Sequence, residues 1–281
     1  MDGPSLDPRI LEYYEASWDE DARIRSGINE LELIRTREIV ERFLPDHGLR
    51  VLDVGGAAGV HAEWLLESGH SVVLIDPVPR HIAEAESALG DAADFSAQVG
   101  DGRHLEFEDD SFDVVLLLGP LYHLPDRYDR LTCWNEAMRV LRPGGWVFAA
   151  VISRFASLFS GLSEDVIFDP VFRGVVLQDL LDGHHENPPG QDFFTTAYFH
   201  HPDEARTEAE EVGLSVEAVL GVEGIASWIP RLAKSWADPE RREIIIEAAR
   251  TIESEPTLLG LGPHLLVVAT NPSNDETTEV R

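Results

Sequence analysis

The stretch VLDVGGAAGV, residues 51–60, decides the fold. An apolar run ends at Asp53, a glycine-rich turn follows it, and the helical pattern VHAEWLLESG comes next. Gly55 and Gly56 allow a tight turn, and Gly59 lets the following helix pack close to the strand. A bare turn of this kind also lets a nucleotide-like ligand touch main-chain atoms. The stretch therefore predicts a strand, turn and helix that bind a ligand at the turn.

The sequence on either side of this unit follows the same pattern. Short β-branched runs alternate with helical patterns between residues 46 and 153. This alternation indicates an α/β fold in which a parallel sheet carries helices on both faces. The expected strands are RVLDVGG, SVVLIDP, FSAQVGD, FDVVLLLG and WVFAAVIS, and the expected helices include VHAEWLLESG, PRHIAEAESAL and residues 127–141.

Changes in this pattern predict the domain boundaries. Residues 1–45 are largely helical in pattern and are expected to form an N-terminal lid. Residues 46–153 and 202–271 form the core, because strand and helix patterns resume in the second range and end in HLLVVATNP. Residues 154–201 are rich in aromatic side chains and show no clean period, which predicts an inserted cap over the carboxyl edge of the sheet. The polar residues 272–281 are expected to form a flexible tail.

The composition is strongly acidic. Of 281 residues, 52 are acidic and 22 are basic, which gives a formal net charge of −30, and Lys234 is the one lysine. Nucleic acids and anionic membranes bind proteins through lysine and arginine, so this charge argues against both as partners. An acidic, lysine-poor surface is also typical of proteins adapted to concentrated salt. We interpret the charge as a solvation feature of that halophile-like kind.

The cysteine content and the hydropathy pattern bear on the cellular compartment of the protein. Cys133 is the one cysteine, which excludes an internal disulfide and a cysteine-built metal site. It lies in the helical pattern LTCWNEAMRVL and is expected to be a core residue. No apolar run reaches the roughly 18 residues of a membrane span, and the first residues lack the regions of a signal peptide. We therefore expect a cytoplasmic protein, present as a monomer or a homodimer.

Four consecutive predicted strands end in polar or glycine residues. Asp76 follows Asp53 by 23 positions (76 − 53) and ends the second strand just before Pro77, where an acidic residue can accept hydrogen bonds from both ribose hydroxyls. The third strand ends in VGDGR, which places Asp101 where it can meet an adenine edge. The fourth ends in LLLGPLYHL, beside the point where such sheets bind ligands. Together these ends predict a nucleotide-like ligand.

The motifs VLDVGGAAG, VVLIDP, VGDGR, FDVVLLLGPLYHL and RVLRPGG resemble those of the class I S-adenosylmethionine-dependent methyltransferases. The resemblance covers residues 45–153 closely and residues 202–270 by the order of elements. It implies a Rossmann-like seven-stranded sheet, S-adenosylmethionine as the cofactor and S-adenosylhomocysteine as the product. One departure is Ala57, where many members have glycine, and it puts the contact of the loop at that point in doubt.

The resemblance also assigns residues to the parts of the cofactor. The assigned residues are Asp53, Gly55, Gly56, Ala57 and Gly59 along the methionine part, Asp76 and Pro77 at the ribose, Asp101 and Gly102 at the adenine, and Leu118 and Gly119 beneath the sulfonium. An amino-terminal helix in relatives commonly closes over the cofactor. Tyr14 and Arg35 are therefore expected to reach the methionine carboxylate, which the planar fork of an arginine suits. An amphipathic helix with solvated charges remains the alternative.

Methyl transfer from a sulfonium requires the protein mainly to align the acceptor and to exclude water. His123 follows the fourth strand where an acceptor would sit, and an imidazole suits a general base at neutral pH. The ring of Tyr122 could face the sulfonium, because an aromatic face attracts a cation. The alternatives are structural: His123 bonded to the loop backbone, and Tyr122 packed in the core.

The predicted cap contributes candidate acceptor-binding residues, with packing inside the cap as the alternative. They are His185, Asn187, Tyr198 and His200. The cap also contains two pairs of adjacent histidines. Adjacent residues seldom share a metal, and no histidine spacing of three or four occurs there, so we expect no metal site.

The expected acceptor is a small molecule. Enzymes that methylate adenine amines in nucleic acids typically have an Asn/Asp-Pro-Pro-aromatic motif after the fourth strand, and this chain has GPLY there. Methylation of a cytosine carbon needs a cysteine after a proline, whereas Cys133 lies in a helical pattern behind Leu131 and Thr132. Transfer to oxygen, nitrogen or carbon stays open. Two other functions stay open as well: a cofactor-binding sensor or partner protein without transfer activity, and a nicotinamide-dependent oxidoreductase. The oxidoreductase is disfavoured because GGAAGVHAEW lacks the G-x-G-x-x-G spacing.

Overall fold

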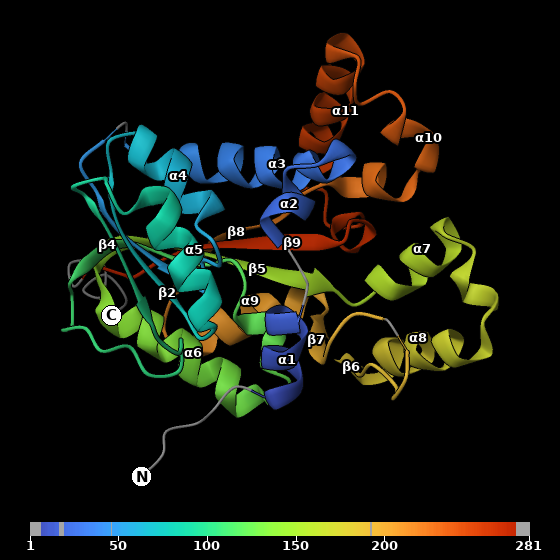
Figure 1. Ribbon diagram of the computed structural model, residues 1–281, viewed down its shortest axis with the longest axis horizontal. Coiled ribbons are helices and arrows are strands. Elements are labelled where there is room, and N and C mark those ends of the chain that lie inside the picture. The colour runs from blue at the N-terminus through green and yellow to red at the C-terminus, as the bar shows by residue number, and fades with distance from the viewer. Residues whose placement is uncertain (1–6, 17–19, 46, 192, 274–281) are drawn as a thin grey trace, which may run out of the picture.

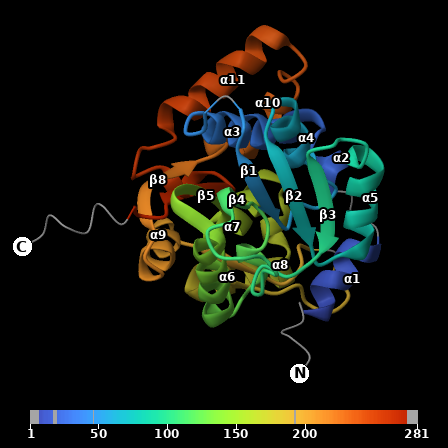
Figure 2. The same cartoon turned by 90° about the vertical axis from the view of Figure 1, so that its left-hand side faces the viewer.

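A twisted sheet forms the centre of the protein (Figures 1 and 2). In the computed structural model, which describes residues 7–16, 20–45, 47–191 and 193–273, five parallel strands lie in the order β3-β2-β1-β4-β5. The chain reverses its direction across the sheet between β1 and β4, which is where open α/β sheets bind ligands. The five strands are β1 (Arg50–Val54), β2 (Ser71–Asp76), β3 (Phe95–Val99), β4 (Phe112–Leu117) and β5 (Leu141–Ser153).

Two further strands complete the expected sheet. β9 (His264–Thr270) runs antiparallel to β5, and β8 (Ser215–Gly221) runs antiparallel to β9 and hence in the direction of β5. These seven strands confirm the predicted Rossmann-like architecture. The short strands β6 (His184–His185) and β7 (Ala197–His200) extend it, because β7 pairs with the last residues of β5 and β6 pairs with β7.

Helices cover both faces of the sheet, as the alternation of patterns predicted (Figure 2). The strand β4 shows why, since Val114 and Leu116 face one apolar core while Val115 and Leu117 face the other. The first core includes side chains of α3 (Glu30–Glu41), α4 (Val60–Glu67) and α5 (Pro79–Leu89), and the second includes those of α6 (Arg127–Val140) and α9 (Pro202–Glu211). Cys133 is fully buried in the second core, as predicted, and burial raises the pKa of its thiol.

The amino-terminal segment is not one helix. It forms α1 (Pro8–Ala16), α2 (Glu20–Ile24), a 3-10 turn η1 (Gly27–Asn29) and then α3. Gly27 has a φ of 57°, a left-handed conformation that glycine adopts readily and that interrupts a helix. The helix α3 packs along the sheet, while α1 lies at its carboxyl edge (Figure 1).

The segment 154–201 has more regular structure than its pattern predicted. It contains α7 (Ala156–Ser163), a 3-10 turn η3 (Val166–Phe168) and α8 (Pro170–Asp182) besides β6 and β7. The helix α8 was hidden because apolar residues lie on all its sides: Val175 and Val176 are buried, whereas Leu177 and Leu181 are exposed. Figure 1 shows α7 and α8 projecting from one end of the sheet.

Further helices follow β8. They are η4 (Gly224–Trp228), α10 (Pro230–Ala233) and α11 (Pro239–Ile252), and η5 (Leu259–Leu261) precedes β9. Leu31 of α3 shares a small core with Ile245 and Ile246 of α11, which joins the carboxyl-terminal part of the chain to the lid. Most of the tail that we expected over 272–281 lies outside the described residues. No helix in the described ranges is long and apolar enough to cross a membrane.

Trp134 tests the core beneath α6. Its side chain is fully buried, and we expect Trp134→Ala to destabilise the protein by about 3–5 kcal/mol because the substitution leaves a large cavity. Tyr128→Ala on the same helix is the matched control, since Tyr128 is 77% exposed and its truncation removes little packing. Urea unfolding of the two variants measures the difference, and equal losses of stability would contradict this packing.

Candidate functional site

One large cavity lies at the carboxyl ends of β1, β2, β3 and β4, under α1 and α2. The space between its lining residues is about 1040 Å³ when the open solvent at its mouth is included. Most of the residues that the sequence assigned to a cofactor or to catalysis line it. They are Tyr14, Asp53, Gly55, Gly56, Ala57, Asp76, Pro77, Asp101, Gly102, Leu118, Gly119, Tyr122 and His123.

The turn between β1 and α4 is held against β2. The backbone N–H groups of Gly55 and Gly56 donate to the carbonyl of Ile75. A Cβ at Gly56 would lie 2.6 Å from the Asp53 carboxylate, so no side chain fits there. Ala57 has a φ of 46°, an uncommon value for a residue with a side chain, and its N–H donates to Asp76 Oδ2 at 3.0 Å. The turn therefore keeps its left-handed shape although alanine stands at this position.

Asp53 is a buried carboxylate with no hydrogen-bond partner for either oxygen among the described residues. Burial, together with the nearby charges of Asp76 and Asp21, raises the pKa of Asp53 to about 7. A buried, unsatisfied acceptor is costly to keep unless a ligand satisfies it. Asp53 therefore fits a cationic or hydrogen-bond-donating ligand group beside the glycine turn.

Asp76 ends β2 as a carboxylate held in a fixed orientation. Its Oδ1 accepts from the N–H of Val78 at 2.8 Å and from Nδ1 of His81 at 3.0 Å, and its Oδ2 accepts from Ala57. The side chain is almost completely buried but lines the cavity. Its orientation is thus set before any ligand binds.

The adenine position predicted at the end of β3 also lines the cavity. The carboxylate of Asp101 accepts from the guanidinium of Arg103, which also donates to Asp129 at 2.6 Å. A Cβ at Gly102 would lie 3.0 Å from Cys133 Sγ and from Val54, tighter than ordinary contact. The cavity wall therefore has no side chain at Gly102, and the carboxylate of Asp101 lies beside it.

His123 and Tyr14 meet across the cavity. Their ring nitrogen Nε2 and hydroxyl are hydrogen-bonded at 2.8 Å, although they are 109 positions apart in the chain. Arg80 donates to the carbonyl of Tyr14 at 2.6 Å and so attaches α1 to the start of α5. The Tyr122 ring lies 4.7 Å from that of His123, and its hydroxyl donates to the carbonyl of Leu118. The lid helix thus supplies part of the wall around His123.

Arg35 does not take the place that we expected. It is fully buried on α3, pairs with Glu38 and Glu253, and does not line the cavity. Arg42 donates to Glu253 as well, at 2.6 Å. Arg35 therefore joins the lid to the segment after α11. Gly59 also stays outside the lining, where it has a φ of 94° as the N-cap of α4.

None of the four cap candidates lines the cavity either. His185 bonds Asp179 at 2.9 Å through Nδ1, and Asn187 donates to two carbonyls of its own loop. Both contacts lie within the cap. His185 and Asn187 thus make the contacts inside the cap that the packing alternative predicts.

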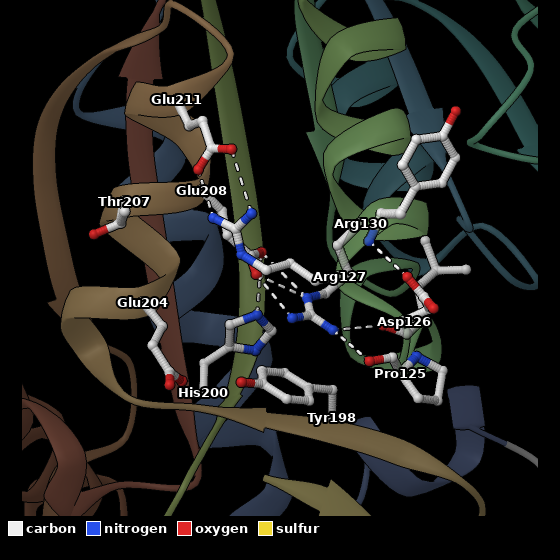
Figure 3. A network of polar contacts seen from close by, with 12 residues as sticks. Pro125, Asp126, Arg127, Arg130, Tyr198, His200, Glu204, Thr207, Glu208 and Glu211 are labelled. Atoms are coloured by element: carbon white, nitrogen blue, oxygen red, sulfur yellow. Dashed lines mark hydrogen bonds and ion pairs between the residues drawn. The ribbon is translucent and has the colours of Figure 1, made fainter. Parts of the chain in front are cut away.

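Tyr198 and His200 belong to a buried ion-pair network that joins the cap to the core (Figure 3). Arg130 of α6 pairs with Glu208 of α9 at 2.8 Å, and His200 Nε2 contacts the same carboxylate at 3.4 Å. The guanidinium of Arg130 lies 3.7 Å from the centre of the Tyr198 ring. Through these contacts Tyr198 and His200 help to hold β7 against α6 and α9.

The sequence reasoning missed several residues that line the cavity, among them the ionisable Asp21, Glu32, His61 and His81. Asp21 and Glu32 come from the lid, where a helical pattern alone does not tell which face covers a ligand. His61 lies two positions after the glycine turn, on the first turn of α4, and that spacing was a usable signal. No lysine or arginine is among the described residues that line the cavity.

Glu32 also belongs to a cluster at the edge of the cavity. Potential metal-ligand atoms of Glu32, Glu223 and His264 lie within 4.8 Å of one another, a spacing that could hold a metal ion. Arg23 already donates to Glu32 at 2.8 Å, however, and Glu223 contacts His264 Nδ1 at 2.6 Å. Burial alone lowers the pKa of His264, but the two carboxylates outweigh it and raise that pKa to about 9. Two cations thus balance the two carboxylates.

The comparisons with known proteins agree with this geometry. Residues 52–149 match a family model described as a methyltransferase domain. The match covers about a third of the chain, and over that part the protein is similar to methyltransferases.

Curated relatives match the methyltransferase domain over a limited length. Methyltransferase GfsG of Streptomyces halstedii is 35% identical over 116 residues, which cover 39% of this chain and 40% of that protein. A ubiquinone biosynthesis O-methyltransferase of Rhizobium johnstonii is 35% identical over 114 residues, which cover 39% of this chain and 44% of that protein. The match thus spans less than half of the length of these two relatives.

Solved structures share the fold of the methyltransferase domain over most of the chain. The complex of the Haloferax volcanii Trm112 methyltransferase activator with a putative methyltransferase gives a TM-score of 0.59 at 21% identity and covers 95% of this chain and 99% of that one. A Haemonchus contortus phosphoethanolamine N-methyltransferase 2 in complex with S-adenosyl-L-methionine gives 0.56 at 18% identity, and covers 85% and 53%. At these identities the likeness concerns the fold.

The cluster around His264 predicts a pH dependence of stability. Its pKa is about 9 in the folded protein against 6.5 for a free histidine, so the stabilisation is complete below pH 6.5 and is lost as the pH rises through about 9. We expect His264→Gln to remove about 1–3 kcal/mol at pH 6.5 and much less at pH 9.5. Urea unfolding at both pH values measures this, and a loss of stability that is equal at both would contradict the charged cluster.

Proposed function

We propose that the protein transfers a methyl group from S-adenosylmethionine to a small-molecule acceptor. One observation carries the proposal: the ends of β1, β2 and β3 direct Asp53, Asp76 and Asp101 to one cavity whose floor is a turn without room for side chains. The methyltransferase domain over residues 52–149 supports it. The activity itself is a proposal, because the match covers less than half of the first curated relatives.

The residues present fit this cofactor. Asp53 offers an unpartnered carboxylate to a cationic group, and the fixed carboxylate of Asp76 suits two neighbouring hydroxyls. Asp101 can accept from an exocyclic amine, beside the close wall at Gly102. When bound, S-adenosylmethionine supplies an electrophilic methyl group, so the protein has to align the acceptor and keep out water rather than activate the methyl.

His123 is proposed as the general base. Its ring is buried between Tyr14, Tyr122 and Phe194, with centroid distances of 5.3, 4.7 and 5.9 Å. In this arrangement the hydroxyl or amine of an acceptor takes the position of the Tyr14 hydroxyl at Nε2, and His123 receives the proton that the acceptor loses. The aromatic rings exclude water from that position.

The class of acceptor follows from charge and from the relatives. A net charge of −30 and five carboxylates in the cavity, those of Asp21, Glu32, Asp53, Asp76 and Asp101, disfavour polyanionic acceptors. The Rhizobium relative is named an O-methyltransferase, which makes hydroxyl compounds the first acceptors to test. A protein activator, as in the Haloferax complex, is a second kind of partner to consider. The composition supports a cytoplasmic, salt-adapted protein.

Turnover separates the proposed enzyme from a sensor that only binds the cofactor. The purified protein is incubated with S-adenosylmethionine and a panel of phenols and amines, and S-adenosylhomocysteine is measured by mass spectrometry. We expect the product to form with at least one acceptor of the panel. Binding of S-adenosylmethionine without product for any acceptor would favour the sensor, and absence of binding would reject both.

His123 and Tyr14 allow a matched comparison of variants. With an acceptor that must lose a proton, His123→Phe should lower kcat about 100-fold or more at neutral pH, within the usual range for loss of a general base. Tyr14→Phe keeps the ring and removes only the contact with Nε2, so we expect a loss of at most about tenfold. An unchanged kcat for His123→Phe would reject the assignment of the base.

A further inference from the structure

His61 lies where the glycine turn meets α4. It is 8% exposed and lines the cavity together with Asp21 and Glu32 of the lid. The α4 helix that begins at Val60 has no side-chain cap, since its N-cap is Gly59. The side chains at this helix end that border the cavity are those of Val60 and His61, and His61 is the polar one.

Trp64 fixes which nitrogen of His61 carries a proton. The indole Nε1–H of Trp64 donates to His61 Nδ1 at 3.3 Å, with the two rings at 87° to each other. An indole can only donate, so Nδ1 is unprotonated. Burial lowers the pKa of His61 to about 4, so the ring is neutral at pH 7 and holds its one proton on Nε2. His61 is thus a neutral donor at Nε2.

The Nε2–H group of His61 has no hydrogen-bond acceptor among the described residues. Its ring contacts Trp64 through the other nitrogen, and the residue lines the cavity. Nε2 is not among the fully buried polar atoms of the described residues that lack a partner, so this donor is accessible from the cavity that His61 lines. A ligand in the cavity would therefore bring an acceptor atom to this place.

The groups of the proposed cofactor differ in what they can accept. The ribose hydroxyls fall to Asp76 and the adenine to Asp101 and Gly102, at the ends of β2 and β3. His61 instead follows the turn after β1 and lines the cavity there. Of the two groups at the methionine end, the ammonium only donates, whereas the carboxylate accepts.

No arginine reaches that carboxylate from the described cavity lining. Arg35 pairs with Glu38 and Glu253 and does not line the cavity. Arg23 pairs with Glu32 at 2.8 Å, and Arg25 contacts Asp21 and Glu63, so the acidic lid side chains near His61 have their charge offset. A neutral donor can therefore accept an anionic group there without strong repulsion from the lid.

We propose that the Nε2–H of His61 binds the α-carboxylate of the methionine part of the cofactor, in the role that the sequence suggested for Arg35. The backbone N–H groups of the first turn of α4 reinforce it, because a helix N-terminus favours an anion. Trp64 is a positioning residue, since it keeps the proton of His61 on the nitrogen that faces the cavity. This inference rests on the proposed cofactor and names one residue of its binding site.

Two ligands that differ only at the methionine end test the proposal. S-adenosylhomocysteine carries the amino-acid group, and 5′-methylthioadenosine lacks it while keeping the adenine, ribose and sulfur. Calorimetric titration of the wild-type protein with each ligand gives the reference affinities. His61→Phe removes the donor, whereas His61→Gln keeps an N–H near the position of Nε2.

We expect His61→Phe to weaken binding of S-adenosylhomocysteine about 10- to 100-fold, the usual cost of losing a hydrogen bond to a charged group. Binding of 5′-methylthioadenosine should change less than about twofold, and His61→Gln should restore most of the lost affinity. Equal losses for both ligands, or an unchanged affinity for S-adenosylhomocysteine, would overturn the proposal. If the wild-type protein binds neither ligand, the proposed function fails instead.

A measurement on the wild-type protein covers the case in which His61→Phe does not fold. In ¹⁵N spectra of histidine-labelled protein, His61 should show a proton on Nε2 and none on Nδ1. Addition of S-adenosylhomocysteine should shift the Nε2 signal, and 5′-methylthioadenosine should leave it nearly unchanged. Trp64→Phe should allow the proton to move to Nδ1 in part of the molecules. A proton on Nδ1 in the wild-type protein would contradict the assignment.

Discussion

The site depends on one steric constraint, which is that Gly55 and Gly56 in the turn after β1 leave no room for side chains. A Cβ at Gly56 would lie 2.6 Å from the carboxylate of Asp53 and 2.8 Å from Leu74. Because the turn is bare, its backbone bonds the end of β2, and Ala57 fixes the orientation of Asp76. The same closeness leaves Asp53 buried without a partner. The arrangement therefore keeps two carboxylates in place at a cost in stability that a bound ligand can offset.

Charged side chains of the amino-terminal segment have two roles: some form ion pairs with the rest of the chain, and others line the cavity. Arg35 does not line the cavity and joins α3 to Glu253, while Glu32 on the same helix lines it. Tyr14 then closes the lid helix onto His123. The lid is thus secured on one side by ion pairs and on the other by contacts that lie in the site itself. Changes in the lid can alter the site without unfolding the core.

The sequence predicts the parts of the site that follow from chain direction. Asp53, Asp76 and Asp101 each end a strand, and parallel strands end at one edge, so their meeting follows from the order of elements. The contact of Tyr14 with His123 does not follow, because it joins positions 109 apart and depends on how the lid folds over. Arg35 shows the same limit: its type suits a carboxylate, but the face of α3 decides which carboxylate it meets.

The ion-pair network of Figure 3 restricts how this protein can acquire a different cap. Glu208 lies on a core helix, whereas its contact His200 lies on the last strand of the cap. A cap transplanted whole from another protein would remove His200 and the Tyr198 ring from around Arg130 and leave buried charge less well enclosed, at a cost of a few kcal/mol. Substitutions in the cap should therefore cost less stability between α7 and β7 than at the junction of the cap with the core.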